Sequence, residues 1–139
     1  MRSVKEALDE IRGEFAEFTD SFDRYAYLVE LAGLLLPYPE EYRTDAHLVR
    51  GCQSHVWLRI TVEDGRFFFL ADSDTLIIKG ILYLLQAVLN DASAEDVAET
   101  ELTLLADLEI SESFSDARQK GIVSVAEALR SAAKEACRA

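Results

Sequence analysis

The strongest candidate for chemistry in this sequence is a cysteine that follows a glycine at the start of an alternating apolar stretch. Gly51 precedes Cys52, and the alternation begins at Val56. A turn there would present the thiol at the edge of a sheet, where functional residues often lie. The thiolate is the reactive form, and positive charge on Arg50 and His55 would raise its population. We expect a reactive thiol; the alternative is a cysteine that packs as a small apolar side chain.

The second cysteine and the histidines raise the question of a metal site. Cys52 and His55 are residue types that bind zinc, but a complete site needs further ligands. The remaining supply is His47, Cys137 and carboxylates such as Asp74, and no second pair shows ligand spacing. Cys137 lies near the end of the sequence, where residues are commonly frayed. We interpret Cys137 as incidental rather than as a resolving partner for Cys52. A metal site at Cys52 and His55 is a weaker alternative than a reactive thiol.

Two further polar features flank the expected helices. Asp72, Ser73 and Asp74 form a polar run that turn formation and helix capping would explain. The functional alternative is that these carboxylates accept hydrogen bonds from the backbone of the cysteine loop. Arg118 lies at the start of the last expected helix, although helix N-termini favour anions over cations. Either it is solvated, or it pairs with an acid or approaches the thiolate.

Composition excludes several classes of function. The chain has 139 residues, a net charge of −12 and a pI near 4.5, which argues against binding nucleic acid or an anionic membrane. The most apolar stretch, residues 76–89, is too short to cross a bilayer. No G-x-S-x-G motif occurs, and six glycines form no phosphate-binding loop. The sequence shows no hydrophobic signal segment, so we expect a cytoplasmic protein whose cysteines stay reduced.

Hydrophobic periodicity predicts helices on both sides of one hairpin. The residues around Asp64 and Gly65 mark the turn, with strands expected at 56–62 and 67–70 and a short edge strand at 47–49. Helices are expected from Ser3 to Phe18, from Asp20 to Pro37, at 75–90, from Ser93 onward and after Ser115. We therefore expect a single α+β domain over residues 1–139, with helices on a small antiparallel sheet of about three strands.

Short motifs along the chain resemble those of the SufE/CsdE family. They occur in the family's order and approximate spacing over nearly the whole sequence. The motifs are Glu40-Glu41-Tyr42-Arg43, Gly51-Cys52-Gln53-Ser54, Val56-Trp57-Leu58, Asp72-Ser73-Asp74, Lys79-Gly80, and Arg118 with Gly121. One departure is Lys120, where family members often carry an amide.

The resemblance implies a sulfur acceptor for a cysteine desulfurase of the SufS/CsdA type in iron–sulfur cluster assembly. Cys52 falls on the acceptor position, while Asp74, Lys79 and Arg118 fall around the cysteine loop or the partner surface. Pyridoxal phosphate belongs to the partner, and no cofactor is implied for this chain. The family fold is similar to that of the IscU scaffold, so a zinc- or cluster-binding scaffold is the alternative. Such scaffolds use more cysteines than the two present here.

The implied reaction is thiol exchange. The Cys52 thiolate attacks the outer sulfur of a persulfide on the desulfurase and carries that sulfur away. We expect Val56, Trp57 and nearby apolar side chains to shield Cys52 at rest, because a persulfide is readily oxidised. The loop would then open when the desulfurase docks and relay the sulfur to a cluster scaffold or another acceptor.

Overall fold

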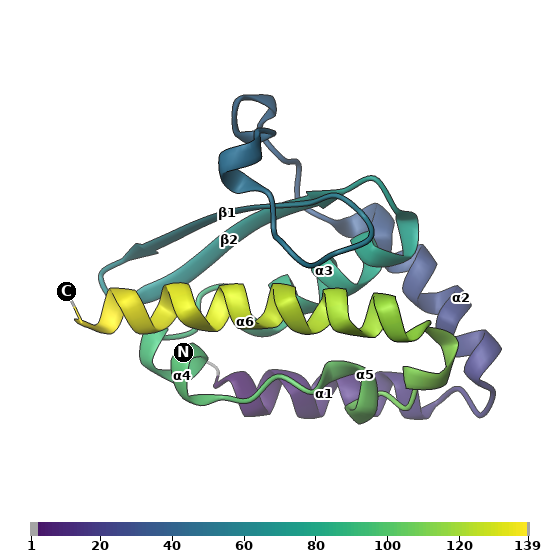
Figure 1. Ribbon diagram of the computed structural model, residues 1–139. Coiled ribbons are helices and arrows are strands. Elements are labelled where there is room, and N and C mark those ends of the chain that lie inside the picture. The colour runs from purple at the N-terminus through teal and green to yellow at the C-terminus, as the bar shows by residue number, and fades with distance from the viewer. Residues whose placement is uncertain (1–2, 139) are drawn as a thin grey trace.

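The computed structural model describes residues 3–138 as helices packed around one hairpin (Figure 1). The helices are α1 Val4–Ala16, α2 Ser21–Leu31, α3 Leu76–Leu89, α4 Ala94–Glu99, α5 Leu104–Asp107 and α6 Asp116–Arg138. The strands are β1 Val56–Glu63 and β2 Arg66–Ser73, and single 3₁₀ turns occur at Ala32–Leu34, Glu40–Tyr42, Asp45–His47 and Ser111–Ser113. The α+β class is confirmed.

Side-chain caps begin four helices where the sequence predicts them, but α3 begins after Thr75 without the side-chain cap predicted from Ser73 or Asp74. Ser3 and Glu6 form a reciprocal capping box at the start of α1. Asp20 accepts a hydrogen bond at the start of α2, Ser93 does so for α4, and the Ser115 hydroxyl accepts from the first turn of α6. The second helix ends earlier than predicted, because one 3₁₀ turn replaces its last turn before the prolines.

The predicted hairpin is present and longer than expected. The strands pair antiparallel from Val56 opposite Ser73 to Glu63 opposite Arg66. Asp64 and Gly65 both have positive φ angles, 51° and 76°, as a two-residue turn that matches the strand twist requires. Because β2 continues to Ser73, Asp72 and Ser73 belong to the strand, and the prediction that they form a turn is wrong.

The third strand is absent from the described residues. Residues 45–47 form a 3₁₀ turn, and only Leu48 bridges to Trp57, supported by a 2.8 Å hydrogen bond from the Val49 amide to the Val56 carbonyl. Immediately afterwards the chain turns into residues 50–55, the cysteine loop that carries Cys52, so a longer ladder cannot form. The sheet therefore has two strands rather than about three.

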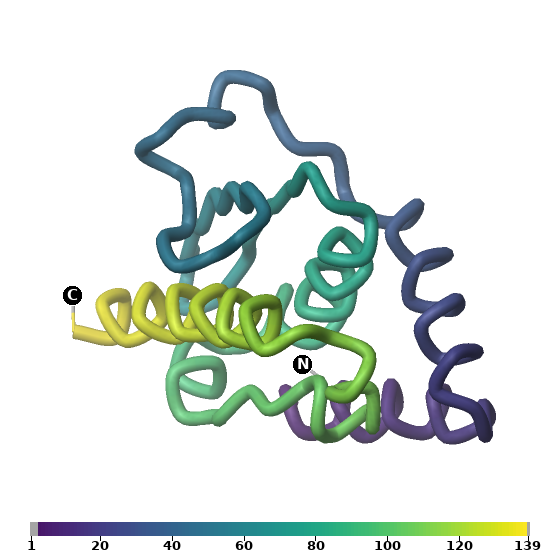
Figure 2. The backbone as a smooth tube through the Cα atoms, turned by 45° about the vertical axis from the view of Figure 1, so that its right-hand side comes forward, coloured from purple at the N-terminus to yellow at the C-terminus, as the bar shows by residue number. Residues whose placement is uncertain are grey.

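Helix α3 forms the centre of the core. It packs against β2, α1 and α2, while α6 lies along β1 and α4 (Figures 1 and 2). Residues 37–50 cover the other face of the sheet, where Arg43 and Arg59 stack on aromatic rings. None of the helices between residues 3 and 138 is long and apolar enough to cross a membrane. Because α6 lies along β1, the cysteine loop lies between β1 and the first turns of α6.

Candidate functional site

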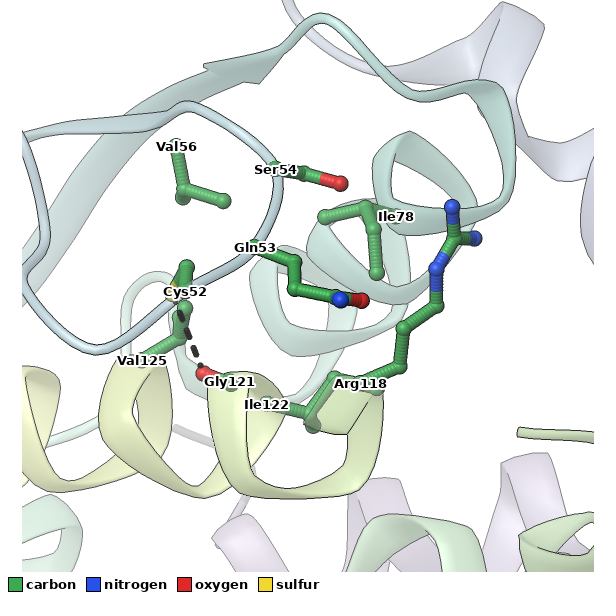
Figure 3. A pocket seen from close by; sticks show the side chains of 9 residues that line it. All are labelled: Cys52, Gln53, Ser54, Val56, Ile78, Arg118, Gly121, Ile122 and Val125. Carbon is green, nitrogen blue, oxygen red and sulfur yellow. Dashed lines mark hydrogen bonds between the residues drawn. The ribbon is translucent and has the colours of Figure 1, made fainter. Parts of the chain in front are cut away.

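The cysteine loop packs directly on α6 because two glycines allow a close approach. Gly51 has a φ of 90°, and a Cβ atom there would lie 2.8 Å from the Ser124 hydroxyl oxygen. A Cβ atom on Gly121 would lie 3.3 Å from the Cα of Cys52. The Cys52 thiol donates a 3.3 Å hydrogen bond to the Gly121 carbonyl (Figure 3). The loop therefore seats its thiol against the backbone of the helix.

A small, mostly apolar cavity lies beside the thiol. Its volume is about 20 Å³, enough for roughly one water-sized group. Apolar side chains from β1, α3 and α6 line it, and the polar side chains come from the loop and the start of α6 (Figure 3). The lining residues are Val56, Ile78, Ile122 and Val125, then Gln53, Ser54 and Arg118, with Cys52 and Gly121 closing one side. Shielding by Val56 is as expected, but Trp57 does not line the cavity, and α3 and α6 supply the other apolar groups.

The thiol is less reactive at rest than local sequence suggested. Cys52 is partly buried, and this burial raises the pKa of its thiol. The side chain of His55 is directed to Asp74, and Arg50 is exposed. The sequence-based prediction that these two neighbours raise the thiolate population is therefore wrong for the closed loop, because desolvation decides the pKa.

The C-terminal end of the loop is held by five residues that we call the loop anchor: Ser54, His55, Ser73, Asp74 and Thr75. Asp74 accepts from the His55 amide at 3.1 Å and contacts its Nδ1 at 2.7 Å. The Ser73 hydroxyl donates to the His55 carbonyl at 2.7 Å, and the Ser54 and Thr75 hydroxyls lie 2.6 Å apart. The bond with the His55 side chain, aided by bonds from the Thr75 hydroxyl and the His55 amide, lowers the pKa of Asp74. The loop-acceptor alternative is thus correct for Asp74.

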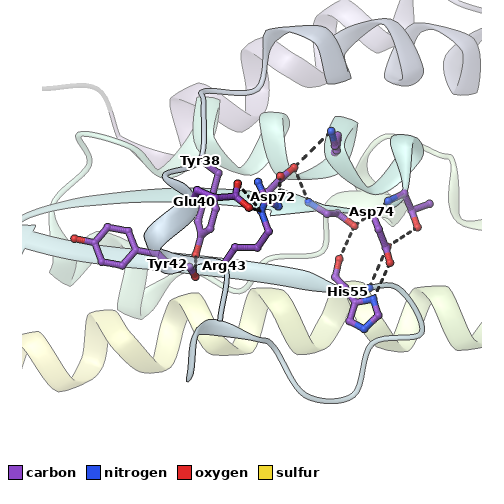
Figure 4. Close-up of polar contacts among 10 residues, drawn as sticks. Tyr38, Glu40, Tyr42, Arg43, His55, Asp72 and Asp74 are labelled. Carbon is purple, nitrogen blue, oxygen red and sulfur yellow. Dashed lines mark hydrogen bonds and ion pairs between the residues drawn. The ribbon is translucent and has the colours of Figure 1, made fainter. Parts of the chain in front are cut away.

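Asp72 has a different set of partners from Asp74. Its carboxylate lies 2.6 Å from Arg43 Nη1 (Figure 4) and 3.5 Å from Lys79 Nζ. Burial raises the pKa of Asp72, but bonds from Arg43 and the Ser73 amide outweigh it and leave the pKa lowered. Sequence reasoning does not single out Arg43 as a site residue; its place in the Glu40–Arg43 motif is the available signal.

The basic residues at the start of α6 are placed at the edge of the site. Arg118 lines the cavity, and its guanidinium extends away from Cys52 (Figure 3). No hydrogen bond or ion pair joins this side chain to another residue within 3–138. It therefore neither pairs with an acid nor bonds the thiol in the closed loop. Lys120 is exposed and does not line the cavity.

The possible metal ligands do not come together. Among residues 3–138, no group of three or more His, Cys, Asp or Glu side chains could hold a metal ion. His47 contacts the Thr44 hydroxyl, and the His55 ring contacts Asp74. Cys137 lies near the far end of α6, about 24 Å beyond Gly121 at 1.5 Å per residue. This separation also prevents a disulfide with Cys52 within one chain.

The raised pKa of Cys52 gives a testable dependence on pH. Folding favours the neutral thiol, so its contribution to stability is complete below the unfolded pKa of about 8.5 and is lost as pH rises toward the folded pKa. We expect urea unfolding to show a steeper loss of stability at pH values above about 8.5 in the wild-type chain than in Cys52→Ala. Parallel losses in the two proteins would contradict the burial of the thiol.

Structural comparison supports this arrangement of helices and hairpin. A solution structure of a hypothetical protein from Thermus thermophilus aligns over 100% of both chains with a TM-score of 0.81. The two sequences are 20% identical, so this similarity establishes the fold alone. The class is an α+β fold in which a hairpin packs against helices.

Sequence comparison identifies the family. Residues 9–133 match the family described as "SufE: Fe-S metabolism associated domain". Sulfur acceptor protein CsdE of Escherichia coli (strain K12) is 35% identical over 127 residues, which cover 90% of this chain and 86% of that protein. The chain belongs to the SufE family, as its motifs predicted.

Proposed function

We propose that this chain accepts sulfur on Cys52 from a cysteine desulfurase of the SufS/CsdA type, stimulates that enzyme and relays the sulfur to iron–sulfur cluster assembly. Membership of the SufE family and the similarity to a sulfur acceptor protein support this role. The observation that carries the proposal is the seating of the Cys52 thiol beside a cavity of about 20 Å³. Residues 1–139 would act as one cytoplasmic domain without a cofactor of its own.

Sulfur transfer requires no net oxidation or reduction. The Cys52 thiolate, after losing its proton to solvent or a partner base, attacks the outer sulfur of the desulfurase persulfide. A new S–S bond forms at Cys52 as the old S–S bond breaks, and the desulfurase cysteine leaves as a thiolate. The desulfurase, which would use pyridoxal phosphate to form its persulfide, is thereby regenerated. The sulfane sulfur now resides on Cys52.

The closed loop must open for this attack. In the closed position the thiol is partly buried, its pKa is raised, and its proton is directed to the Gly121 carbonyl. A docked desulfurase would have to draw residues 50–53 away from α6. Afterwards the cavity beside Cys52 could take in the outer sulfur, because both are about the size of one water. Mostly apolar walls would then limit oxidation of the persulfide.

Mass spectrometry after incubation with a cysteine desulfurase and cysteine tests the proposal. We expect the intact chain to gain about 32 Da, the mass of one sulfur atom, on the peptide that contains Cys52. A reducing agent should remove this adduct, because a persulfide is reducible. A control without cysteine should show no gain. Loading of the desulfurase without any adduct on Cys52 would refute the proposal.

A further inference from the structure

Arg43 links the segment that covers the sheet to the surroundings of the cysteine loop. Its Nη1 lies 2.6 Å from Asp72 Oδ2, and its guanidinium lies over the Tyr38 ring at 5.6 Å (Figure 4). The guanidinium also stacks over the Trp57 ring at 5.0 Å. Glu40 completes the set with a 3.1 Å contact to the Arg43 Nε. Planar stacking and a directed ion pair together fix the orientation of this side chain.

The first connection to the loop runs through Asp72. Asp72 Oδ1 accepts a 2.8 Å hydrogen bond from the amide of Ser73, and the Ser73 hydroxyl donates to the His55 carbonyl at 2.7 Å. Ser73 is only 3% exposed, so its hydroxyl has little water to bond instead. Asp72 therefore helps to position Ser73, which in turn holds the backbone of His55, three residues after Cys52.

The second connection runs through Trp57. The His55 ring stacks on the Trp57 ring, with centroids 5.8 Å apart and planes 15° apart. The same ring carries the Arg43 guanidinium. His55 is thus held through its backbone by Ser73 and Asp74, and through its ring by Asp74 and Trp57. Arg43 contacts a member of each connection.

We propose that Arg43 is a positioning residue for Cys52. By holding Trp57 and Asp72 against the loop anchor, Arg43 sets how often the cysteine loop opens. The proposal rests on the role of Cys52 as sulfur acceptor. The Cys52 side chain itself contributes only one hydrogen bond, from a thiol, which is a weak donor. The loop anchor therefore supplies most of the polar contacts that keep the loop closed, and loss of Arg43 loosens it.

Alkylation of Cys52 by iodoacetamide, followed by peptide mass spectrometry, tests this without a desulfurase. We expect Arg43→Met to raise the rate at Cys52 about fivefold under native conditions, a typical effect of removing one partly buried polar contact. Exposed Cys137 is the internal control, and its rate should not change. Arg59→Met is the matched variant, because Arg59 stacks on Tyr42 on the same face of the sheet rather than on Trp57.

Trp57 supplies an independent signal, since it is the one tryptophan in the sequence. We expect its emission to shift to longer wavelength in Arg43→Met and to stay unchanged in Arg59→Met. Arg43→Lys should restore part of the wild-type alkylation rate, because lysine keeps the charge that faces Asp72 but loses the planar stack. If Arg43→Met does not fold, Asp72→Asn should give the same acceleration at Cys52.

Two results would overturn the proposal. One is a Cys52 alkylation rate in Arg43→Met equal to that of the wild type. The other is an acceleration of Cys52 alkylation that does not depend on Arg43 in particular. It would be equal in Arg59→Met, or it would rise in proportion to the fraction unfolded in urea, since Arg43 would then only stabilise the fold. Either result would leave sulfur loading of Cys52 untouched, whereas failure of the acceptor role would appear only in the desulfurase assay.

Discussion

Replacement of Cys52 by serine will abolish sulfur acceptance from a cysteine desulfurase. The serine hydroxyl fits the same seat, but it is a weak nucleophile at neutral pH, and that seat directs it to the Gly121 carbonyl rather than to a base. We expect the adduct of about 32 Da to disappear and the stimulation to be lost, so that sulfide release falls to the rate of the desulfurase alone. Intact mass spectrometry and sulfide release measure the two effects. Folding should be unchanged, because the substitution is smaller by less than one methyl group.

Cys137→Ser is the matched control for this substitution. Cys137 lies near the far end of α6, about 24 Å beyond Gly121 along the helix, so the same docked partner cannot serve both thiols. We expect this variant to load as much sulfur as the wild type. Sulfur found on Cys137 at the wild-type rate in the Cys52→Ser protein would contradict the assignment of the acceptor.

Local rules account for the parts of the fold that sequence predicted well. The helix caps depend on residues two or three positions apart, and the hairpin depends on two adjacent residues that tolerate positive φ. Ser3, Ser93 and Asp64 each act through such neighbours. The prominence of Cys52 came from the glycine before it and from motifs within the same short segment. Features of this kind can be predicted from a few neighbouring residues alone.

The surroundings of the thiol depend on contacts that are remote in sequence. Cys52 bonds a carbonyl 69 residues away, and Arg43 pairs with a carboxylate 29 residues away. Reasoning from neighbours in sequence placed positive charge from Arg50 and His55 beside the Cys52 thiol. In the structure α6 buries the thiol, and the His55 side chain bonds Asp74 instead. A pattern of neighbouring residues cannot predict that Asp74, rather than Cys52, contacts His55. The wrong assignment of Asp72 to a turn has the same origin, since its ion pairs favour a longer β2.

The missing third strand shows how one functional loop limits local pairing. Leu48 and Val49 have the composition of a strand and make one bridge to β1. A longer ladder would require the chain to remain extended beside β1, but Gly51 bends it toward α6 at a φ of 90°. The bend that ends the pairing also seats Cys52. Strand propensity alone does not contain this choice.

Substitution of Gly121 by alanine will force the cysteine loop open while leaving α6 intact. The new methyl group would lie 3.3 Å from the Cα of Cys52 and 3.6 Å from its sulfur, which is too close for the backbone contact to persist unchanged. Overpacking of this kind costs about 2 kcal/mol, and opening of the loop relieves it. We therefore expect alkylation of Cys52 to accelerate about thirtyfold, measured by peptide mass spectrometry, because each 1.4 kcal/mol is about a tenfold change in the open population.

Gly13→Ala separates this steric effect from the greater helix propensity of alanine. Gly13 lies within α1, and a Cβ atom there would have no neighbour within 4 Å. Both substitutions should favour their helices by up to about 1 kcal/mol. Gly13→Ala should therefore raise the urea midpoint and leave the alkylation of Cys52 unchanged. Gly121→Ala should expose Cys52 without a matching loss of global stability. If the Gly121→Ala protein alkylates Cys52 at the wild-type rate, the tight seat of the loop on α6 does not control access to the thiol.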